Sequence, residues 1–185
     1  MEPAEKYVVR PVRPEEWAAV REIRLAALRD PAAPIAFLET YETAVARPEE
    51  FWRDRAGRFE LDGSGNQFVA EGADGRWWGS VTVRVEEAGA PLVFGDTSEV
   101  RQAHLVGVYV RPEHRGSGLT EALFRAAVEW AHSLEGLERV RLYVHQDNAR
   151  AQAFYRRFGF GRSGASVAVP GDPAKVEYEM VLERR

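Results

Sequence analysis

A glycine-containing turn carries the clearest chemical signal in this sequence. It consists of Arg115, Gly116, Ser117 and Gly118, between a β-branched run and a long amphipathic run. Glycines let backbone N–H groups converge on one point, and the first turn of a helix adds partial positive charge. The turn therefore predicts an anion site suited to a pyrophosphate, with the Arg115 guanidinium adding a full charge beside it.

The turn does not fit two common nucleotide-binding motifs. It has no Gly-Lys-Ser/Thr and is not a Walker A loop, and Glu121 stands where a dinucleotide fingerprint needs its third glycine. Glycines also occur between a strand and a helix for packing alone. By itself, the turn therefore predicts only an anion at the start of a helix.

Three other side chains could take part in chemistry. Asn148 precedes a helix, where it can cap the helix or offer its amide to a ligand. Tyr155 can donate a proton or hydrogen bond, or can pack with Phe154 and Phe158. His104 has a side chain whose ordinary pKa, about 6.5, suits a general base, although a histidine at the start of a strand is often structural.

Alternating patterns surround these residues. Strands are expected over 7–10, 67–71, 77–85, 104–110, 140–144, 166–169 and 175–182, and helices from Pro14, Pro48, Leu119 and Asn148. A polar loop is expected over 86–100. The strand–helix–strand unit over 104–145 requires a parallel pair, and the other strands favour antiparallel pairing. The sequence predicts a mixed α/β fold with a mostly antiparallel sheet of six or seven strands and about four flanking helices.

Composition excludes several classes of function. The chain has 185 residues, 45% of them hydrophobic, no cysteine and a formal net charge of −4. Without cysteine there can be no disulfide, thiolate metal site or cysteine nucleophile. The acidic balance argues against a nucleic-acid partner. Neither a signal peptide nor a run of about 20 apolar residues is apparent, so we expect a cytoplasmic protein without membrane contact.

Two motifs together resemble the GNAT (Gcn5-related N-acetyltransferase) family. The first is Arg115-x-x-Gly118 with its glycines, after a strand that ends in Val-x-Pro; Thr120 differs from the small residue usual at its position. The second is Asn148-x-x-Ala151-x-x-Phe-Tyr155, followed by Gly-Phe. A third, looser stretch from Ala36 to Thr40 is similar to one in a bacterial subgroup. The resemblance covers essentially the whole chain and implies one GNAT domain over 1–185.

The resemblance implies a binding site for acetyl-coenzyme A. The implied contacts are Val108, Tyr109, Val110, Arg115, Gly116, Ser117, Gly118, Leu119, Thr120, Asn148, Ala151 and Tyr155. The pantetheine arm would pair with the strand around Val108 and Val110 as an added strand. In this family the adjacent parallel strands splay at that point, and Gly107 is consistent with a bulge there.

The resemblance also implies catalytic roles. Tyr155 would act as general acid toward the leaving thiolate, and His104 is the candidate base that takes a proton from the attacking amine. In an unbroken strand, His104 would share a face with Val106, Val108 and Val110. The expected acceptor contacts are Phe37, Glu39, Thr40 and Tyr41, with Glu99 as a further candidate.

The predicted reaction is acetyl transfer from acetyl-coenzyme A to a primary amine, most simply on a small molecule. Protein lysines or N-termini are alternative acceptors. A non-catalytic acyl-coenzyme A-binding regulatory module and a nucleotide-binding α/β domain are alternatives of other classes. Histidine spacing predicts no metal site. Homodimers occur in the family, but nothing in the sequence marks a dimer surface.

Overall fold

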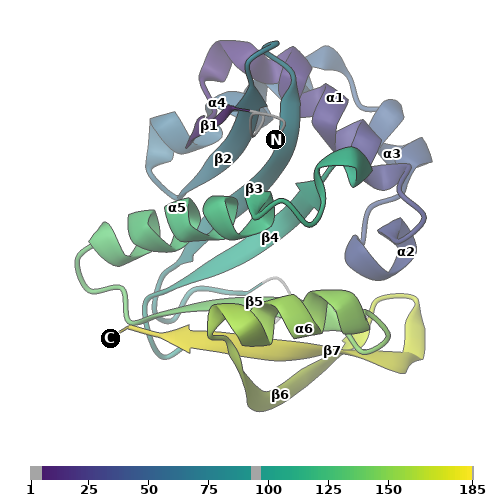
Figure 1. Ribbon diagram of the computed structural model, residues 1–185. Helices are drawn as coiled ribbons and strands as arrows, with labels where there is room; N and C mark the ends of the chain where they lie inside the picture. Colours follow the sequence, from purple (N-terminus) through teal and green to yellow (C-terminus); the bar gives the residue numbers. More distant parts are fainter. Residues whose placement is uncertain (1–5, 93–96, 185) are drawn as a thin grey trace.

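The computed structural model describes residues 6–92 and 97–184. All seven of its strands join one sheet, in the order β1-β2-β3-β4-β5-β7-β6 (Figure 1). The strands are β1 (Tyr7–Pro11), β2 (Gly65–Gly72), β3 (Trp77–Glu86), β4 (Gln102–Val110), β5 (Arg139–His145), β6 (Gly161–Val169) and β7 (Asp172–Glu183). The mixed α/β fold and the strand number predicted from the sequence are confirmed.

Four long helices and two short ones accompany the sheet. The long helices are α1 (Trp17–Leu28), α4 (Glu49–Asp62), α5 (Leu119–Ser133) and α6 (Ala149–Phe158). The short ones, α2 (Ala33–Ala36) and α3 (Tyr41–Val45), lie between α1 and α4 and were not predicted from the sequence. Among the described residues, no helix is long and apolar enough to cross a bilayer.

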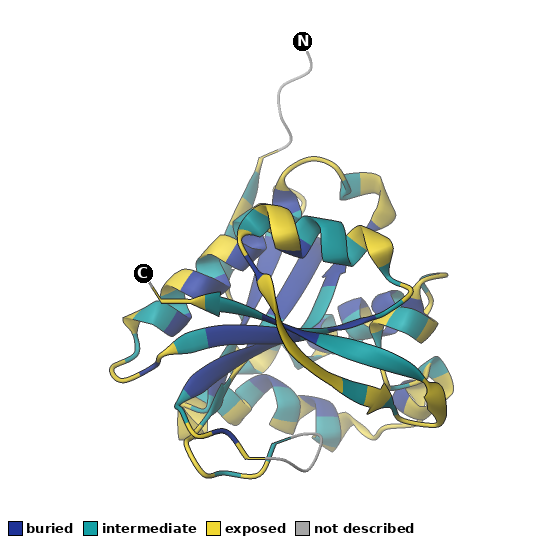
Figure 2. Ribbon diagram, turned by 90° about the horizontal axis from the view of Figure 1, so that it is seen from below, coloured by how far each residue is buried: buried dark blue, intermediate teal, exposed yellow. Residues whose placement is uncertain are grey.

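The helices cover the two faces of the sheet with separate cores. One core joins α5 and α6 to the sheet and includes Phe124, Leu142 and Tyr155. The other joins α1, α3 and α4 and is centred on Trp52, which has no exposed surface. The outer strand β6 is largely exposed (Figure 2). Strands β2 to β5 therefore form the buried frame on which a site can be held.

The parallel pair is short. Strand β4 pairs with β5 only at Gln102, Ala103 and His104, while β5 continues in register with β7 as far as His145. Beyond His104 the two strands separate and leave part of β4 without a neighbour on that side. The predicted splay is present.

A bulge in β4 changes which side chains share a face. Ser80 pairs with Tyr109 and Thr82 with Val106, so Gly107 and Val108 lie opposite the single residue between Ser80 and Thr82. Gly107 has a φ of 63°, in the left-handed region that favours glycine.

The expectation that His104 shares a face with Val108 and Val110 is therefore wrong. Before the bulge, the odd-numbered residues Ala103 and Leu105 face α5. After the bulge, the even-numbered residues Val108 and Val110 face it instead. By alternation His104 points to the opposite face, toward the α1–α4 side. An extra residue reverses the alternation, which the expectation of an unbroken strand did not include.

The predicted loop over 86–100 is present in its described part. Only an isolated bridge between Pro91 and Thr97 interrupts it, and residues 93–96 lie outside the described residues. Strand β3 ends at Glu86, and Glu99 is exposed in the loop.

Candidate functional site

A cavity of about 1000 Å³ occupies the gap where β4 and β5 separate. Most of the predicted site residues line it: Phe37, Glu39, His104, Val108, Tyr109, Val110, Arg115, Gly116, Gly118, Thr120, Asn148, Ala151 and Tyr155. Five predicted residues do not: Thr40, Tyr41, Glu99, Ser117 and Leu119. Motifs far apart in the sequence thus meet around one space.

The glycine turn presents its backbone to the cavity. Gly116 and Gly118 have φ values of 76° and 83°, and a β-carbon on either would meet nothing within 4 Å. The backbone N–H groups from Gly116 to Glu121 have no acceptor among the described residues. Unpaired N–H groups at the start of a 15-residue helix form an anion site.

Two predicted residues in or next to the turn, Ser117 and Leu119, do not line the cavity and have structural roles. The Ser117 hydroxyl donates to the carbonyl of His114 at 2.6 Å, which fixes the turn. The Leu119 side chain is 1% exposed and packs into the α5 core. Any contact of these two residues with an anion would therefore come from their backbone N–H groups.

The Arg115 guanidinium is less free than the sequence suggested. Its Nε donates to the carbonyl of Val110 at 2.9 Å, and Nη2 forms an ion pair with Asp30. Burial of Asp30 opposes ionisation, but the Ala32 N–H and Arg115 together lower the pKa of this carboxyl. Arg115 therefore ties the turn to β4 and to the end of α1, and Asp30 offsets its charge.

Two other arginines supply unpaired charge at this end of the cavity. Arg150 and Arg157 line it from α6 and have no carboxylate within 4.0 Å among the described residues. Sequence reasoning missed both residues. Their spacing of seven, two helical turns, was the available signal, because it places them on one face of a helix.

Helix α6 holds the next two predicted residues. Asn148 caps the helix by accepting the Ala151 N–H at 3.3 Å, and its side-chain amide N–H groups remain available to a ligand. Tyr155 is 9% exposed, stacks on Phe124, and its hydroxyl has no hydrogen-bond partner among the described residues. Burial raises the pKa of Tyr155 to about 12. The phenol therefore stays protonated at neutral pH and faces the cavity as an unused donor.

His104 lies in a polar layer on the opposite face of the sheet. It is 4% exposed, and its Nδ1 lies 3.8 Å from Glu86, too far for a hydrogen bond. Glu86 is bound by both Nε and Nη2 of Arg141 at 2.7 and 2.8 Å, and Arg141 also binds Glu179. Burial lowers the pKa of His104, and Glu86 only partly opposes this shift. The imidazole is therefore neutral at pH 7.

Glu86 remains ionised in this layer. Although burial favours the neutral acid, the neighbouring His104 ring and the Arg141 guanidinium lower the pKa of Glu86 to about 2. Because Nδ1 faces this carboxylate, Nε2 is the His104 nitrogen left for a bound molecule. Sequence reasoning did not find Glu86 or Arg141.

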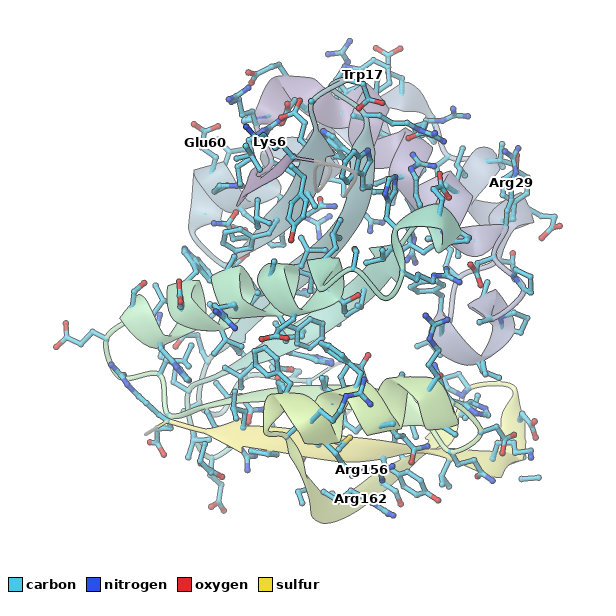
Figure 3. All side chains as sticks on the ribbon, viewed as in Figure 1. Lys6, Trp17, Arg29, Glu60, Arg156 and Arg162 are labelled. Atoms are coloured by element: carbon cyan, nitrogen blue, oxygen red, sulfur yellow. The ribbon has the colours of Figure 1, made fainter. Side chains whose placement is uncertain are left out.

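Only part of the predicted acceptor stretch reaches the cavity. Phe37 lies under the Arg24 guanidinium at 4.9 Å, and Glu39 accepts from Arg24 at 3.0 Å. Thr40 instead caps α3 through the N–H of Thr43, and Tyr41 packs under Arg29, which Figure 3 shows beside α3.

Two more arginines border this second end of the cavity. Arg55 comes from α4 and Arg84 from β3, and neither was a predicted site residue. Among the described residues, no group of histidine and carboxylate side chains could hold a metal ion.

Comparison with known proteins agrees with the two motifs. The sequence model of the acetyltransferase (GNAT) family matches residues 17–160. A mycothiol acetyltransferase of Saccharomonospora viridis is 41% identical over 106 residues, which are 57% of this chain and 32% of that protein. A putative ribosomal protein bS18-alanine N-acetyltransferase of Bacillus subtilis is 37% identical over 62 residues, 34% of this chain and 40% of that protein. The chain thus spans about a third of the length of the mycothiol acetyltransferases that it matches.

Solved structures share the fold. A GNAT-family acetyltransferase from Streptococcus pneumoniae superposes with a TM-score of 0.74 at 18% identity, over 97% of this chain and 100% of that one. The PaiA N-acetyltransferase of Thermoplasma acidophilum, solved with coenzyme A, gives 0.72 at 18% identity, over 97% and 99%. At this identity the likeness concerns the fold alone. The family match covers most of the chain, the two motifs meet at one cavity, and the chain belongs to the acetyltransferase (GNAT) family.

Proposed function

We propose that the protein transfers the acetyl group of acetyl-coenzyme A to a primary amine. One observation carries the proposal: the unpaired N–H groups from Gly116 to Glu121 open into a cavity that continues between β4 and β5. This geometry suits a ligand with a pyrophosphate at one end and an amide-rich arm at the other. The relatives named as acetyltransferases support it.

The residues present fit such a cosubstrate. The turn would hold the pyrophosphate, and Arg150 and Arg157 would add charge to its phosphates. The pantetheine arm would pair with β4 at Val108 and Val110, where β5 offers no partner. Asn148 and Ala151 would border the arm. This arrangement would direct the thioester toward the bulge in β4.

The proposed reaction needs one bond formed and one broken. The amine nitrogen forms a bond to the acetyl carbon, the carbon–sulfur bond breaks, and the sulfur leaves as a thiolate. An alkyl ammonium has a pKa of about 10.4, so it must lose a proton before attack. We assign the proton-accepting role to Nε2 of His104, which is neutral at pH 7.

Tyr155 would stabilise the leaving sulfur. With a pKa of about 12, its phenol is a weaker acid than a thiol, whose ordinary pKa is about 8.5. Complete proton transfer to the thiolate would be uphill by about 5 kcal/mol. Tyr155 therefore acts as a hydrogen-bond donor to the thiolate, and the final proton comes from the medium or from protonated His104.

The acceptor is proposed to be a small molecule. The relatives include enzymes named for mycothiol and for a ribosomal protein N-terminus, so both small and protein acceptors occur among similar proteins. The acceptor end is a lined cavity, which favours a small amine over a protein surface.

Calorimetry with acetyl-coenzyme A tests the binding site. Arg115→Ala combined with Gly118→Asp removes one cation and places a carboxylate in the turn. We expect the Kd to rise at least about 10-fold, because a charge-assisted hydrogen bond contributes about 1.5–3 kcal/mol. Gly136→Asp is the matched control, because Gly136 also has a positive φ, 73°, and open space around it, but lies away from the cavity.

Three outcomes would contradict the proposal. If the double variant binds acetyl-coenzyme A as tightly as the native protein, the turn is not the cofactor site. If ATP or NAD raises the melting temperature and coenzyme A does not, the protein is a nucleotide-binding domain. If coenzyme A binds but no amine in a panel is acetylated, the protein is a binding module.

A further inference from the structure

Three arginines from different elements meet at the acceptor end of the cavity. Arg24 comes from α1, Arg55 from α4 and Arg84 from β3, and all three line the cavity. Arg24 is paired with Glu39 at 3.0 Å. The side chains of Arg55 and Arg84 have no hydrogen bond and no carboxylate within 4.0 Å among the described residues. Neither guanidinium is therefore paired with a carboxylate in the described part of the chain.

Of the three arginines, Arg55 is in the environment least favourable to its positive charge. Burial and the neighbouring cations Arg24, Arg58 and Arg84 lower the pKa of its guanidinium to about 10, and Glu39 only partly opposes them. The Trp52 ring lies 5.7 Å away and offsets little of this, since a cation–π contact contributes about 0.5–1 kcal/mol at a partly exposed site. An enclosed cation normally has an anionic partner.

The position of Arg55 relates it to the proposed chemistry. Arg24 and Arg55 also border a small recess under the β4 bulge, together with Gln67, Thr82 and Gly107. The bulge is where the thioester would arrive, and His104 lies on the same face of β4. An anion held by Arg55 would therefore lie beside an amine placed for attack.

We propose that the acceptor is a small amine that carries a carboxylate, such as an amino acid, and that Arg55 and Arg84 bind this carboxylate. The inference rests on the proposed acetyl transfer and names its substrate class. Guanidinium groups match carboxylates with paired hydrogen bonds. A carboxylate suits this end better than a phosphate dianion, because Glu39 stands within the cluster and would repel the second charge.

Matched pairs of acceptors test the proposal. Acetyl transfer is measured from acetyl-coenzyme A to each of the common amino acids and to its primary amide, which differs only by the loss of the charge. We expect at least one amino acid to exceed its own amide in kcat/KM by 10-fold to 100-fold, the range that a charge-assisted contact supplies. Phosphoethanolamine and peptide amides serve as phosphate and protein-like probes.

Variants assign the preference to Arg55. Arg55→Gln should lower kcat/KM for the preferred amino acid 10-fold to 100-fold, leave its amide unchanged, and leave acetyl-coenzyme A affinity unchanged. Arg55→Lys should recover part of the loss. Arg53→Gln is the matched control, because Arg53 lies on the same helix, is exposed and does not line the cavity. It should leave both acceptors unaffected.

The outcomes separate this inference from the proposed function. Transfer to amines with no acid-over-amide preference would overturn this inference and leave acetyl transfer standing. So would preference for phosphoethanolamine or a peptide amide, or an equal loss for acid and amide in Arg55→Gln. Absence of transfer to every amine, or of coenzyme A binding, would overturn both.

Discussion

The two ends of the cavity present positive charge in different ways. At the proposed cofactor end, backbone N–H groups from Gly116 to Glu121 would form the anion site, and Asp30 offsets the charge of Arg115. At the proposed acceptor end, the guanidinium groups of Arg55 and Arg84 supply the charge. A site made of backbone donors tolerates side-chain change, whereas a site made of side chains changes with each substitution. The acceptor end is therefore where specificity can differ between related proteins.

The largest expected effect comes from removing the proposed general base, which should lower turnover without changing the affinity for the cofactor. His104→Gln should lower kcat about 100-fold or more, because a general base contributes about 10²–10⁴, while acetyl-coenzyme A affinity stays the same. His132→Gln is the control, since His132 lies on α5 and does not line the cavity. Steady-state kinetics measure kcat, and calorimetry measures the affinity for acetyl-coenzyme A. An unchanged kcat would remove His104 from the mechanism.

The same base predicts the direction of a pH effect. In the proposed mechanism the neutral imidazole is the active form, and burial lowers the pKa of His104 below its ordinary value of about 6.5. The loss of activity caused by protonation of His104 should therefore begin only as the pH falls below about 6.5. This acidic limb of the pH–activity profile should be absent in His104→Gln. A limb centred above pH 7 that survives the substitution would assign it to another group.

Tyr155→Phe should have a smaller effect, a decrease in kcat of about 10-fold to 100-fold, because in the proposed mechanism the phenol only donates a hydrogen bond to a leaving group that is already stable. With a pKa of about 12, the tyrosine stays protonated up to about pH 11, so the native enzyme should show no loss from its ionisation below that pH. A loss beyond about 10⁴-fold would indicate full proton transfer.

Arg157→Gln tests the side-chain part of the cofactor end. The KM for acetyl-coenzyme A should rise several-fold, and less in high salt, because an exposed charge is screened. Arg156→Gln is the matched control: Arg156 is the neighbouring exposed residue, labelled in Figure 3, and does not line the cavity. Equal effects of the two variants would show that only overall charge matters.

The smallest expected effect concerns the acceptor end. Glu39→Gln removes the partner of Arg24 and adds a third unpaired cation, so the KM for a carboxylate-bearing acceptor should fall a few-fold, with no change for its amide. Initial rates over a range of acceptor concentrations measure this change. A rise in KM would instead mean that Glu39 contacts the acceptor amine.

The same contrast explains what the sequence could and could not predict. The place of the glycine turn on the cavity wall could be predicted, because glycines, a strand and a helix start are contiguous, and each has a recognisable local pattern. Alternating and β-branched runs likewise predicted six or seven strands, and the strand–helix–strand order over 104–145 predicted the parallel pair. The acceptor end was not predictable, because Arg24, Arg55 and Arg84 lie on three elements and meet only through tertiary packing.

Two finer differences between the predictions and the structure have local causes. The faces of β4 were assigned without its bulge, although Gly107 was a visible signal for one. Thr40 and Tyr41 were assigned to the acceptor site, but a short helix begins after Thr40 and takes both residues into its own contacts. Helices of four or five residues carry too few apolar positions for a periodic signal.

The bulge at Gly107 also has a consequence for how such a protein can change. Because it reverses the alternation of β4, His104 and Val106 face one compartment, while Val108 and Val110 face the other. A substitution at His104 or Val106 can therefore alter the side chains on one face of β4 without altering those on the other face. Deleting a single residue there would exchange the compartments for every side chain from 108 to 110, so we expect natural variation in this strand to proceed by substitution and to preserve its length.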